Sequence, residues 1–292
     1  MVLNEDLTTI DLGDLSFFTR CVFSQNLEKG RRRMTKTAFI ETLGSRFDMT
    51  AISLYVASSD AKLGPRMEGE SSGPWPYRET VGGLMWLVVV TRPDMGNAVR
   101  AVARQSHNPT ARHWKAVIQI IQYLLGTKDL GPTFERGRDW ILRCLWVRTI
   151  CADKADDRKS VSGIAVNLAK SVVSWSRSKQ GVTALSTAQA EYIATGGGVE
   201  EGLFVISVLS FIVPFLSDQC FKMFADKDRV IALATNPLSS ARTKHIDVHF
   251  IRELVRSNTY VSTKKQRADI VTKTLVGADF KAHRGFSMNL HV

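Results

Sequence analysis

The sequence predicts a mixed α/β fold, and two patterns along the chain carry that prediction. Segments with apolar residues at helical spacing fill the middle of the chain, and the most regular one runs from 110 to 126. From about residue 140 onward, segments rich in Val, Ile and Trp alternate with helical segments. Hydrophobic residues make up 44% of the 292 residues, which is enough apolar material for a core and excludes disorder throughout.

The N-terminal part predicts short strands followed by a helix. Aromatic and β-branched residues favour a strand over 17–23, and Lys29-Gly30 favours a turn. Apolar residues at helical spacing predict a helix over 38–47. The stretch 58–76 contains three glycines and three prolines among polar residues, so we expect a linker or long loop there.

Helical segments follow this linker. The apolar segment 77–90 ends before Pro93, and 94–106 continues with apolar residues on one side. In the next segment Thr110 is the expected N-cap, and Gly126 ends the helix. The apolar stripe of this last helix predicts packing and no special chemistry.

The last 150 residues predict strands and helices in alternation. We expect strands over 141–151, 161–175 and 221–224, and helices over 245–255 and 268–275. A further helix begins at Ser186 or Thr187 and runs through Phe204. Residues 196–198 are three consecutive glycines that interrupt this helical pattern at a cost of about 1 kcal/mol per residue relative to Ala.

Charge and cysteine content limit the function classes. The formal net charge is +11, and the ranges 61–150 and 242–292 each carry +6. Such basic blocks attract nucleic acid, although a solvated basic face with no partner explains them equally well. The four cysteines form no C-x-x-C pair, which argues against a zinc ribbon and favours a reducing compartment.

The chain shows no targeting segment and no common nucleotide-binding or hydrolase motif. No apolar run reaches about 18 residues, and the N-terminus is acidic, so we expect an intracellular, cytoplasmic location with no membrane contact. Phosphate-binding loops of the G-x-x-x-x-G-K-[ST] type, G-x-S-x-G and H-E-x-x-H are absent from the sequence.

Four carboxylates lie where an α/β domain can present them together. Asp153 and Asp226 follow strand-like segments, Glu191 lies in the first turns of a helix, and Asp269 begins a late helix. Clustered carboxylates repel one another unless divalent cations, which bind hard oxygen ligands, neutralise them. Two such ions about 4 Å apart can activate a water in phosphodiester cleavage. Each of these carboxylates, taken alone, can be explained equally well as a solvated or helix-capping group and not as a metal ligand.

Several motifs in the same order resemble one family. The segment WPYRETVGGLMWLVVVTRPDMGNAVRAVARQSHNPTARHWKAVIQIIQYLLGTKDLG resembles the region after the polymerase palm in copia-type retrotransposon polyproteins. The segments DDRKSVSGIAV, VVSWSRSKQ, ALSTAQAEYIA, ALATNPLSSARTKHIDV, FIRELVRS and QRADIVTK resemble the ribonuclease H domain of that family. The resemblance runs from about Asp11 nearly to the C-terminus.

The resemblance implies an architecture and an activity. It implies a ribonuclease H-like domain at 140–292, with a central five-stranded mixed sheet and flanking helices. A linker and mostly helical connection region at 61–139, and a fragment of the post-palm region at 1–60, would precede that domain. It also implies Mg²⁺-dependent (or Mn²⁺-dependent) cleavage, with two ions, of RNA in an RNA–DNA hybrid. Because Y-x-D-D is absent from the chain, it cannot act as a polymerase by itself.

Carried over residue by residue, the resemblance assigns the four carboxylates as catalytic metal ligands. Glu191 matches the glutamate of an A-E-Y helix motif, and Asp226 matches the aspartate of F-x-D-N-Q. Asp269 matches the aspartate of A-D-I-L-T-K, and Asp153 matches the first aspartate of D-A-D-aromatic. From the basic blocks we expect phosphate contacts that are independent of sequence. The residues expected to make them are Arg100, Arg104, Arg112, Lys115, Lys264, Lys265, Arg267 and Lys273.

Departures from the family pattern favour a second reading. The chain is shorter than the pattern between Cys151 and Asp156, around 247–249, and over 257–263. Lys227 and Asp228 replace the Asn and Gln that follow the third carboxylate in the family. A shortened strand can lose register and turn side chains to the wrong face. The alternative to a nuclease is therefore a catalytically inactive remnant that acts at most as a basic nucleic-acid-binding protein.

Overall fold

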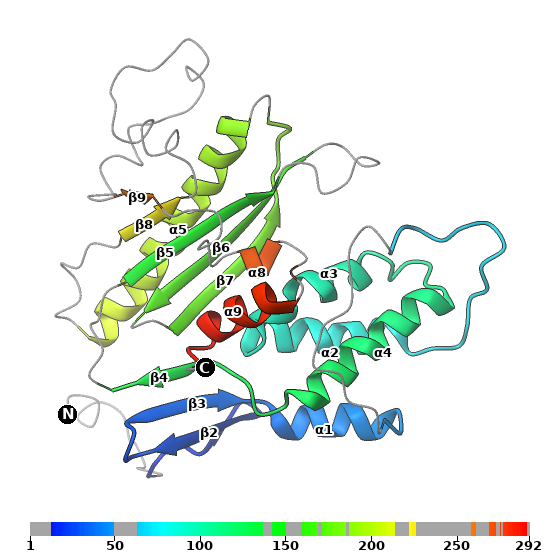
Figure 1. Cartoon of the computed structure of the whole chain (residues 1–292), viewed down its shortest axis with the longest axis horizontal. Coiled ribbons are helices and arrows are strands. Elements are labelled where there is room, and N and C mark those ends of the chain that lie inside the picture. Colours follow the sequence, from blue (N-terminus) through cyan, green and yellow to red (C-terminus); the bar gives the residue numbers. More distant parts are fainter. Residues whose placement is uncertain are drawn as a thin grey trace, which may run out of the picture.

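A computed structural model describes the chain in two sheets and a set of helices. The described residues are 13–49, 63–136, 142–149, 159–168, 171–184, 187–213, 222–225, 258–260, 269–272, 275 and 277–290. A four-stranded antiparallel sheet and a five-stranded mixed sheet lie on either side of the C-terminal helices, with further helices beside them (Figure 1). The predicted mixed α/β fold class is confirmed.

The four-stranded sheet joins the N-terminus to a segment about a hundred residues later. Its strands in order are β1 (Phe17–Phe18), β2 (Cys21–Asn26), β3 (Arg31–Thr35) and β4 (Thr133–Glu135). The sequence did not predict β3, because three consecutive arginines are atypical of a strand. Its cross-strand neighbours hold them: Arg31 Nε lies 2.7 Å from Glu135 Oε1, and Arg33 Nε lies 3.2 Å from Thr133 Oγ1. This pairing crosses the predicted boundary at residue 60.

The predicted helices of the first half are present. They are α1 (Thr37–Arg46), α2 (Tyr77–Val90), the 3₁₀ helix η3 (Pro93–Met95), α3 (Gly96–Ala103) and α4 (Ala111–Gly126). Thr110 is the N-cap of α4, as predicted. Apolar side chains of all four α-helices form one core, in which Ile40, Leu84 and Ile120 are fully buried. Where the structure describes the predicted linker, at 63–76, it has no helix or strand.

The C-terminal helices complete this same core. They are α8 (Asp269–Thr272) and α9 (Gly277–Ser287), of which the sequence predicted only the first. Ile270 and Phe280 belong to the core formed by α1 to α4. The backbone N–H of Thr133 donates to the carbonyl of Met288 over 3.1 Å, which holds the end of α9 against β4. The last segment of the chain therefore packs on its first half.

The five-stranded sheet has mixed strand directions. Its strands are β5 (Leu142–Thr149), β6 (Val161–Leu168), β7 (Ser171–Lys179), β8 (Lys222–Ala225) and β9 (Asn258–Tyr260), in the order β7-β6-β5-β8-β9. The pairs β5–β6 and β6–β7 are antiparallel, whereas β5–β8 and β8–β9 are parallel. The predicted strand over 161–175 is in fact part of a two-stranded hairpin, β6 and β7. Every residue of β6 is buried, so both faces of the sheet are covered there.

Helix α5 (Thr187–Ile212) covers one face of this sheet. The helix continues through its three glycines. One of them lies close to the sheet: a Cβ at Gly197 would lie 3.3 Å from Ile164 Cδ1 of β6. On the other face, the indole N–H of Trp175 in β7 donates to the carbonyl of Val88 in α2 over 2.7 Å. Helices α2, α3 and α8 therefore lie on the face opposite α5 (Figure 1).

One described helix has the length and apolar composition that a membrane span requires. It is Gln189–Ile212 within α5, and the sequence had predicted no such segment. Its N-terminal half packs on the five-stranded sheet, where Ala190, Ala194 and Val199 are buried. A core helix of a soluble protein meets the same criteria, so the absence of membrane contact stays a prediction. The predicted helix at 245–255 lies beyond the described ranges.

Candidate functional site

Four strands, β5, β7, β8 and β9, run toward the same end of the five-stranded sheet. Thr149, the last residue of β5, pairs with Val161, the first of β6, and Val161 in turn pairs with Lys179, the last of β7. Strand β8 runs parallel to β5 but is shorter: Phe224 pairs with Leu145, so its last residue, Ala225, lies level with Trp146, three residues before the end of β5. We call this edge of the sheet the carboxyl end of β5. Carboxyl ends of strands are a usual place for functional side chains.

Two of the predicted carboxylates follow these strands in the sequence. Asp153 comes four residues after Thr149, and Asp226 follows Ala225 directly. Both aspartates belong to stretches that the structure leaves undescribed. Their predicted roles as metal ligands therefore stay predictions.

Glu191 lies in the first turns of α5, on the side of the helix that faces the sheet. Only 3% of the residue is exposed, and its neighbours Ala190, Ala194 and Thr195 are buried as well. The hydroxyl of Thr195 donates to the Glu191 carbonyl over 2.8 Å. A carboxylate is costly to bury unless partners or a cation compensate its charge. Glu191 is therefore not a solvated surface group, and its role as a metal ligand stays a prediction.

Gln180 places this part of α5 against the carboxyl end of β5. Its side-chain N–H group donates to the Ala190 carbonyl over 2.8 Å and to Ser162 Oγ over 2.9 Å. Since Ser162 pairs with Arg148, next to the last residue of β5, the first turns of α5 lie at the carboxyl end of β5. The sequence analysis did not select Gln180; its only signal was that it ends the motif VVSWSRSKQ.

Asp269 begins α8 and is 5% exposed. Helix α8 contacts β5, β6 and β7, and also α3 and η3. It therefore lies on the face of the sheet opposite α5, so Glu191 and Asp269 approach the sheet from different sides (Figure 1). Side chains from opposite faces can share a site only beyond the strand ends. Among the described residues no three His, Cys, Asp or Glu side chains form a group that could hold a metal ion.

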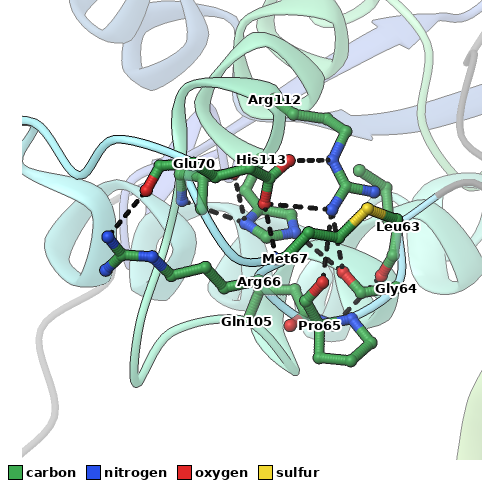
Figure 2. Close-up of polar contacts among 10 residues, drawn as sticks. Leu63, Gly64, Pro65, Arg66, Met67, Glu70, Gln105, Arg112 and His113 are labelled. Carbon is green, nitrogen blue, oxygen red and sulfur yellow. Dashed lines mark hydrogen bonds and ion pairs between the residues drawn. The ribbon is translucent and has the colours of Figure 1, made fainter.

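One predicted phosphate-binding residue has an internal partner. The guanidinium of Arg112 pairs with Glu70, with Nε 3.0 Å from Oε1 and Nη2 3.3 Å from Oε2. The same Nη2 lies 3.3 Å from the Pro65 carbonyl (Figure 2). A hydrogen bond from the Met67 N–H and the bonds from Arg112 outweigh desolvation and hold the pKa of Glu70 below its usual value. Arg112 therefore fixes the loop at 63–70 on α4.

His113 joins the same loop to the start of α4 through its imidazole ring (Figure 2). The Thr110 N–H lies 3.0 Å from His113 Nδ1, and His113 Nε2 lies 3.0 Å from the Gly64 carbonyl. A backbone N–H can only donate and a carbonyl can only accept, so the geometry requires the neutral imidazole with its proton on Nε2. The loop and the start of α4 are thus joined through one buried ring. We call Arg112, His113, Glu70 and the carbonyls of Gly64 and Pro65 the loop clamp.

The remaining predicted basic residues differ in exposure. Arg104 and Lys115 are exposed on α3 and α4. Arg100 is half-buried and lines a cavity of about 350 Å³ between α2, α3 and β7, together with Trp175 and Arg177. The structure does not describe the other four, which are Lys264, Lys265, Arg267 and Lys273.

Comparison with known proteins places the chain in a family. No family model matches it. It is 37% identical over 207 residues, 68% of the chain, to the retrovirus-related Pol polyprotein from transposon TNT 1-94 of Nicotiana tabacum. It is also 34% identical over 214 residues, 71% of the chain, to each of the corresponding polyproteins from transposons RE2 and RE1 of Arabidopsis thaliana. The matched part spans only 14–15% of the length of these relatives. The chain is therefore homologous to copia-type retrotransposon Pol polyproteins and corresponds to one region of such a polyprotein.

Proposed function

We propose that this chain is the post-palm segment and ribonuclease H-like domain of a copia-type polyprotein. In this proposal it cleaves the RNA strand of RNA–DNA hybrids with two divalent metal ions. The strand order β7-β6-β5-β8-β9, with three antiparallel strands followed by two parallel ones, supports the ribonuclease H-like assignment. The homology to Pol polyproteins supports the polyprotein origin.

One observation carries the proposed activity. The strands that precede Asp153 and Asp226 run in the same direction, with β8 ending three residues short of the end of β5, and the buried Glu191 is tied to the carboxyl end of β5 through Gln180. Carboxylate oxygens gathered at one edge suit Mg²⁺ and Mn²⁺, which prefer hard oxygen ligands. Two such ions supply an activated water and stabilise the leaving oxygen of a phosphodiester. The carboxylates would hold the ions, and the exposed basic residues would hold the phosphates of the hybrid.

The decisive experiment is a hybrid-cleavage assay on the whole chain. We expect the wild type to cleave the RNA strand of a labelled RNA–DNA hybrid with Mg²⁺ or Mn²⁺ and to stop when EDTA is added. Glu191→Gln and Asp226→Asn keep the shape of the side chain but remove one anionic ligand, so both should abolish cleavage. Asp228→Asn is the matched control and should retain activity, because that position is neutral in the family pattern.

Three results would reject the proposal in different ways. Cleavage without metal, or cleavage unchanged by Asp226→Asn, would mean that another site or a contaminant acts. Binding of the hybrid without any cleavage would favour the inactive remnant that binds nucleic acid. Neither binding nor cleavage would remove the functional proposal as a whole. Acting on reverse-transcription intermediates, the chain would work inside the cell, and we propose no membrane partner.

A further inference from the structure

Gln180 lies at the end of the sheet where we place the candidate site. It follows β7 directly, and its backbone N–H donates over 2.8 Å to the carbonyl of Ser160, the residue before β6. The residue is 4% exposed, so its side chain points into the protein. A buried amide needs partners for its donors. The two donor contacts of Gln180 reach across from the sheet to the helix that covers it.

The amide joins a strand to a helix through one nitrogen. Nε2 lies 2.9 Å from Ser162 Oγ of β6 and 2.8 Å from the Ala190 carbonyl of α5. Both acceptors are themselves buried. The hydrogen bonds therefore operate away from bulk water, where they are stronger and more costly to lose.

We propose that Gln180 is a positioning residue for Glu191; its effect on cleavage rests on the proposed nuclease function, whereas its effect on α5 does not. Farther along α5, the Ser174 hydroxyl of β7 donates to the Glu201 carboxylate. Between these two points α5 contacts the sheet through small and apolar side chains such as Ala194 and Gly197, whose contacts are not directional. The two hydrogen bonds from Gln180 therefore fix the turn of α5 that carries Glu191, ten residues before the Ser174–Glu201 bond. Displacing a reacting group by about 1 Å can cost roughly 100-fold in rate.

The acceptor atom of the same amide supports this reading. Gln180 Oε1 is buried and makes no hydrogen bond within the described part of the chain. A buried acceptor without a donor is destabilising. A leucine of similar size would avoid that penalty but could not donate to Ser162 and Ala190. If residue 180 served only to fill space, the Gln180 amide would be less favourable than a leucine side chain. Its advantage is the N–H group that donates to Ser162 and Ala190.

The test compares two changes in the same sheet. Gln180→Leu removes both donors at nearly constant volume. Asn167→Leu is the matched control: Asn167 is 1% exposed and lies near the other end of β6, and within the described ranges neither polar atom of its side chain has a hydrogen-bond partner. Hydrogen exchange measured by mass spectrometry reports on α5, Mn²⁺ titration reports on metal affinity, and hybrid cleavage reports on the reaction.

For Gln180→Leu we expect exchange over 187–195 to accelerate roughly tenfold, with the rest of the chain unchanged. We also expect weaker Mn²⁺ binding and cleavage slower by roughly 10- to 100-fold, with hybrid affinity unchanged. Asn167→Leu should leave all of these within about twofold, since it breaks no hydrogen bond.

Several outcomes would overturn the proposal. Unchanged exchange over 187–195 in Gln180→Leu would show that the amide does not hold this turn. Uniformly faster exchange across the chain would indicate a general structural role. Wild-type cleavage in Gln180→Leu while Glu191→Gln is inactive would leave the nuclease proposal intact and reject the positioning role. If the wild type does not cleave, the nuclease proposal fails, and the exchange data still decide whether Gln180 holds α5.

Discussion

The guanidinium of Arg284 donates to the hydroxyl of Tyr123 across 161 residues of sequence, with Nη1 3.2 Å from Oη. The Tyr123 hydroxyl in turn donates to the carboxylate of Asp94. Asp94 forms a bidentate ion pair with Arg92, in which both N–O distances are 2.9–3.0 Å. A chain of polar side chains therefore links α9 to α4 and to η3. This chain explains why the last helix packs with the helical core and not only with the sheet.

The ion pair at the centre of this chain should be essential for stability. Both side chains are fully buried, so Asp94→Asn would leave the Arg92 guanidinium without its counter-charge. Breaking a buried pair on one side typically costs about 3–5 kcal/mol. We expect a decrease of that size in the free energy of unfolding, measured by urea denaturation. Glu79→Gln breaks the exposed pair with Arg46 and serves as the control, which should leave the midpoint almost unchanged. Equal losses in the two variants would contradict this account.

The same pair predicts how stability responds to acid. Burial raises the pKa of Asp94, but the charge and hydrogen bonds of Arg92 and the Tyr123 hydroxyl more than offset it, so the net pKa lies below the usual value. A carboxylate with a lowered folded pKa contributes its full stabilisation above the unfolded pKa of about 3.9. That contribution is lost as pH falls through the lower folded value. The stability gap between wild type and Asp94→Asn should therefore be constant near neutrality and shrink below about pH 4. A gap that widens on acidification would refute the assignment.

Gly131 allows the chain to turn closely beside β3. A Cβ at this position would lie 1.9 Å from the Met34 carbonyl oxygen, which is a backbone atom that cannot rotate away. We expect Gly131→Ala to lower the free energy of unfolding by about 1–3 kcal/mol, as overpacking does. Gly82→Ala is the matched control, because its Cβ meets no atom within 4 Å on the exposed side of α2. It should stabilise the helix by about 0.5–1 kcal/mol. Thermal unfolding of both variants would reveal the opposite signs, and a neutral Gly131→Ala would reject the close approach.

Local signals let the sequence predict the helices well. The start of α4 follows from Thr110, because a cap and an apolar stripe lie within one short segment. Elements that depend on distant partners were not predictable in the same way. Strand β3 contains three consecutive arginines, and it depends on a partner in β4, because Arg31 pairs with Glu135 about a hundred residues later in the sequence. Helix α9 has a weak apolar pattern, and its place is set by the contact of Phe280 with Tyr123.

The candidate site shows the same division. Glu191 could be selected from its motif; the structure places it buried against the sheet, and its role as a metal ligand stays a prediction. Gln180 could not be selected by chemistry, because an amide gains its role only when β6 and α5 are brought together. Arg112 was predicted to contact phosphate, but its partner Glu70 belongs to a segment that the sequence identifies only as a linker. Charge alone cannot distinguish a basic residue that binds a ligand from one that fixes a loop.

The imidazole of the loop clamp should hold the start of α4. His113→Leu would leave the Thr110 N–H and the Gly64 carbonyl without their buried partner, and we expect a loss of about 1–3 kcal/mol in the free energy of unfolding. His113→Gln is the informative control, because a glutamine at this position can still accept from the N-cap N–H. It should recover about half of the loss. Limited proteolysis should cut His113→Leu faster within 63–70. Resistance equal to that of the wild type would mean that the ring does not secure the loop.

The last prediction separates basic residues that face solvent from the one in the loop clamp. Arg104→Gln and Lys115→Gln remove exposed cations, so each should weaken binding of an RNA–DNA hybrid and lower the slope of log affinity against log salt by about 1. Arg112→Gln should leave that slope unchanged, because its guanidinium is engaged by Glu70 and the Pro65 carbonyl. It should instead lower the midpoint of thermal unfolding, since Glu70 loses its cationic partner.

The measurement is a fluorescence anisotropy titration at three salt concentrations, paired with thermal unfolding. A change in salt slope for Arg112→Gln comparable to that of Arg104→Gln would show that Arg112 leaves Glu70 to bind phosphate. An unchanged slope in all three variants would mean that these faces bind no nucleic acid.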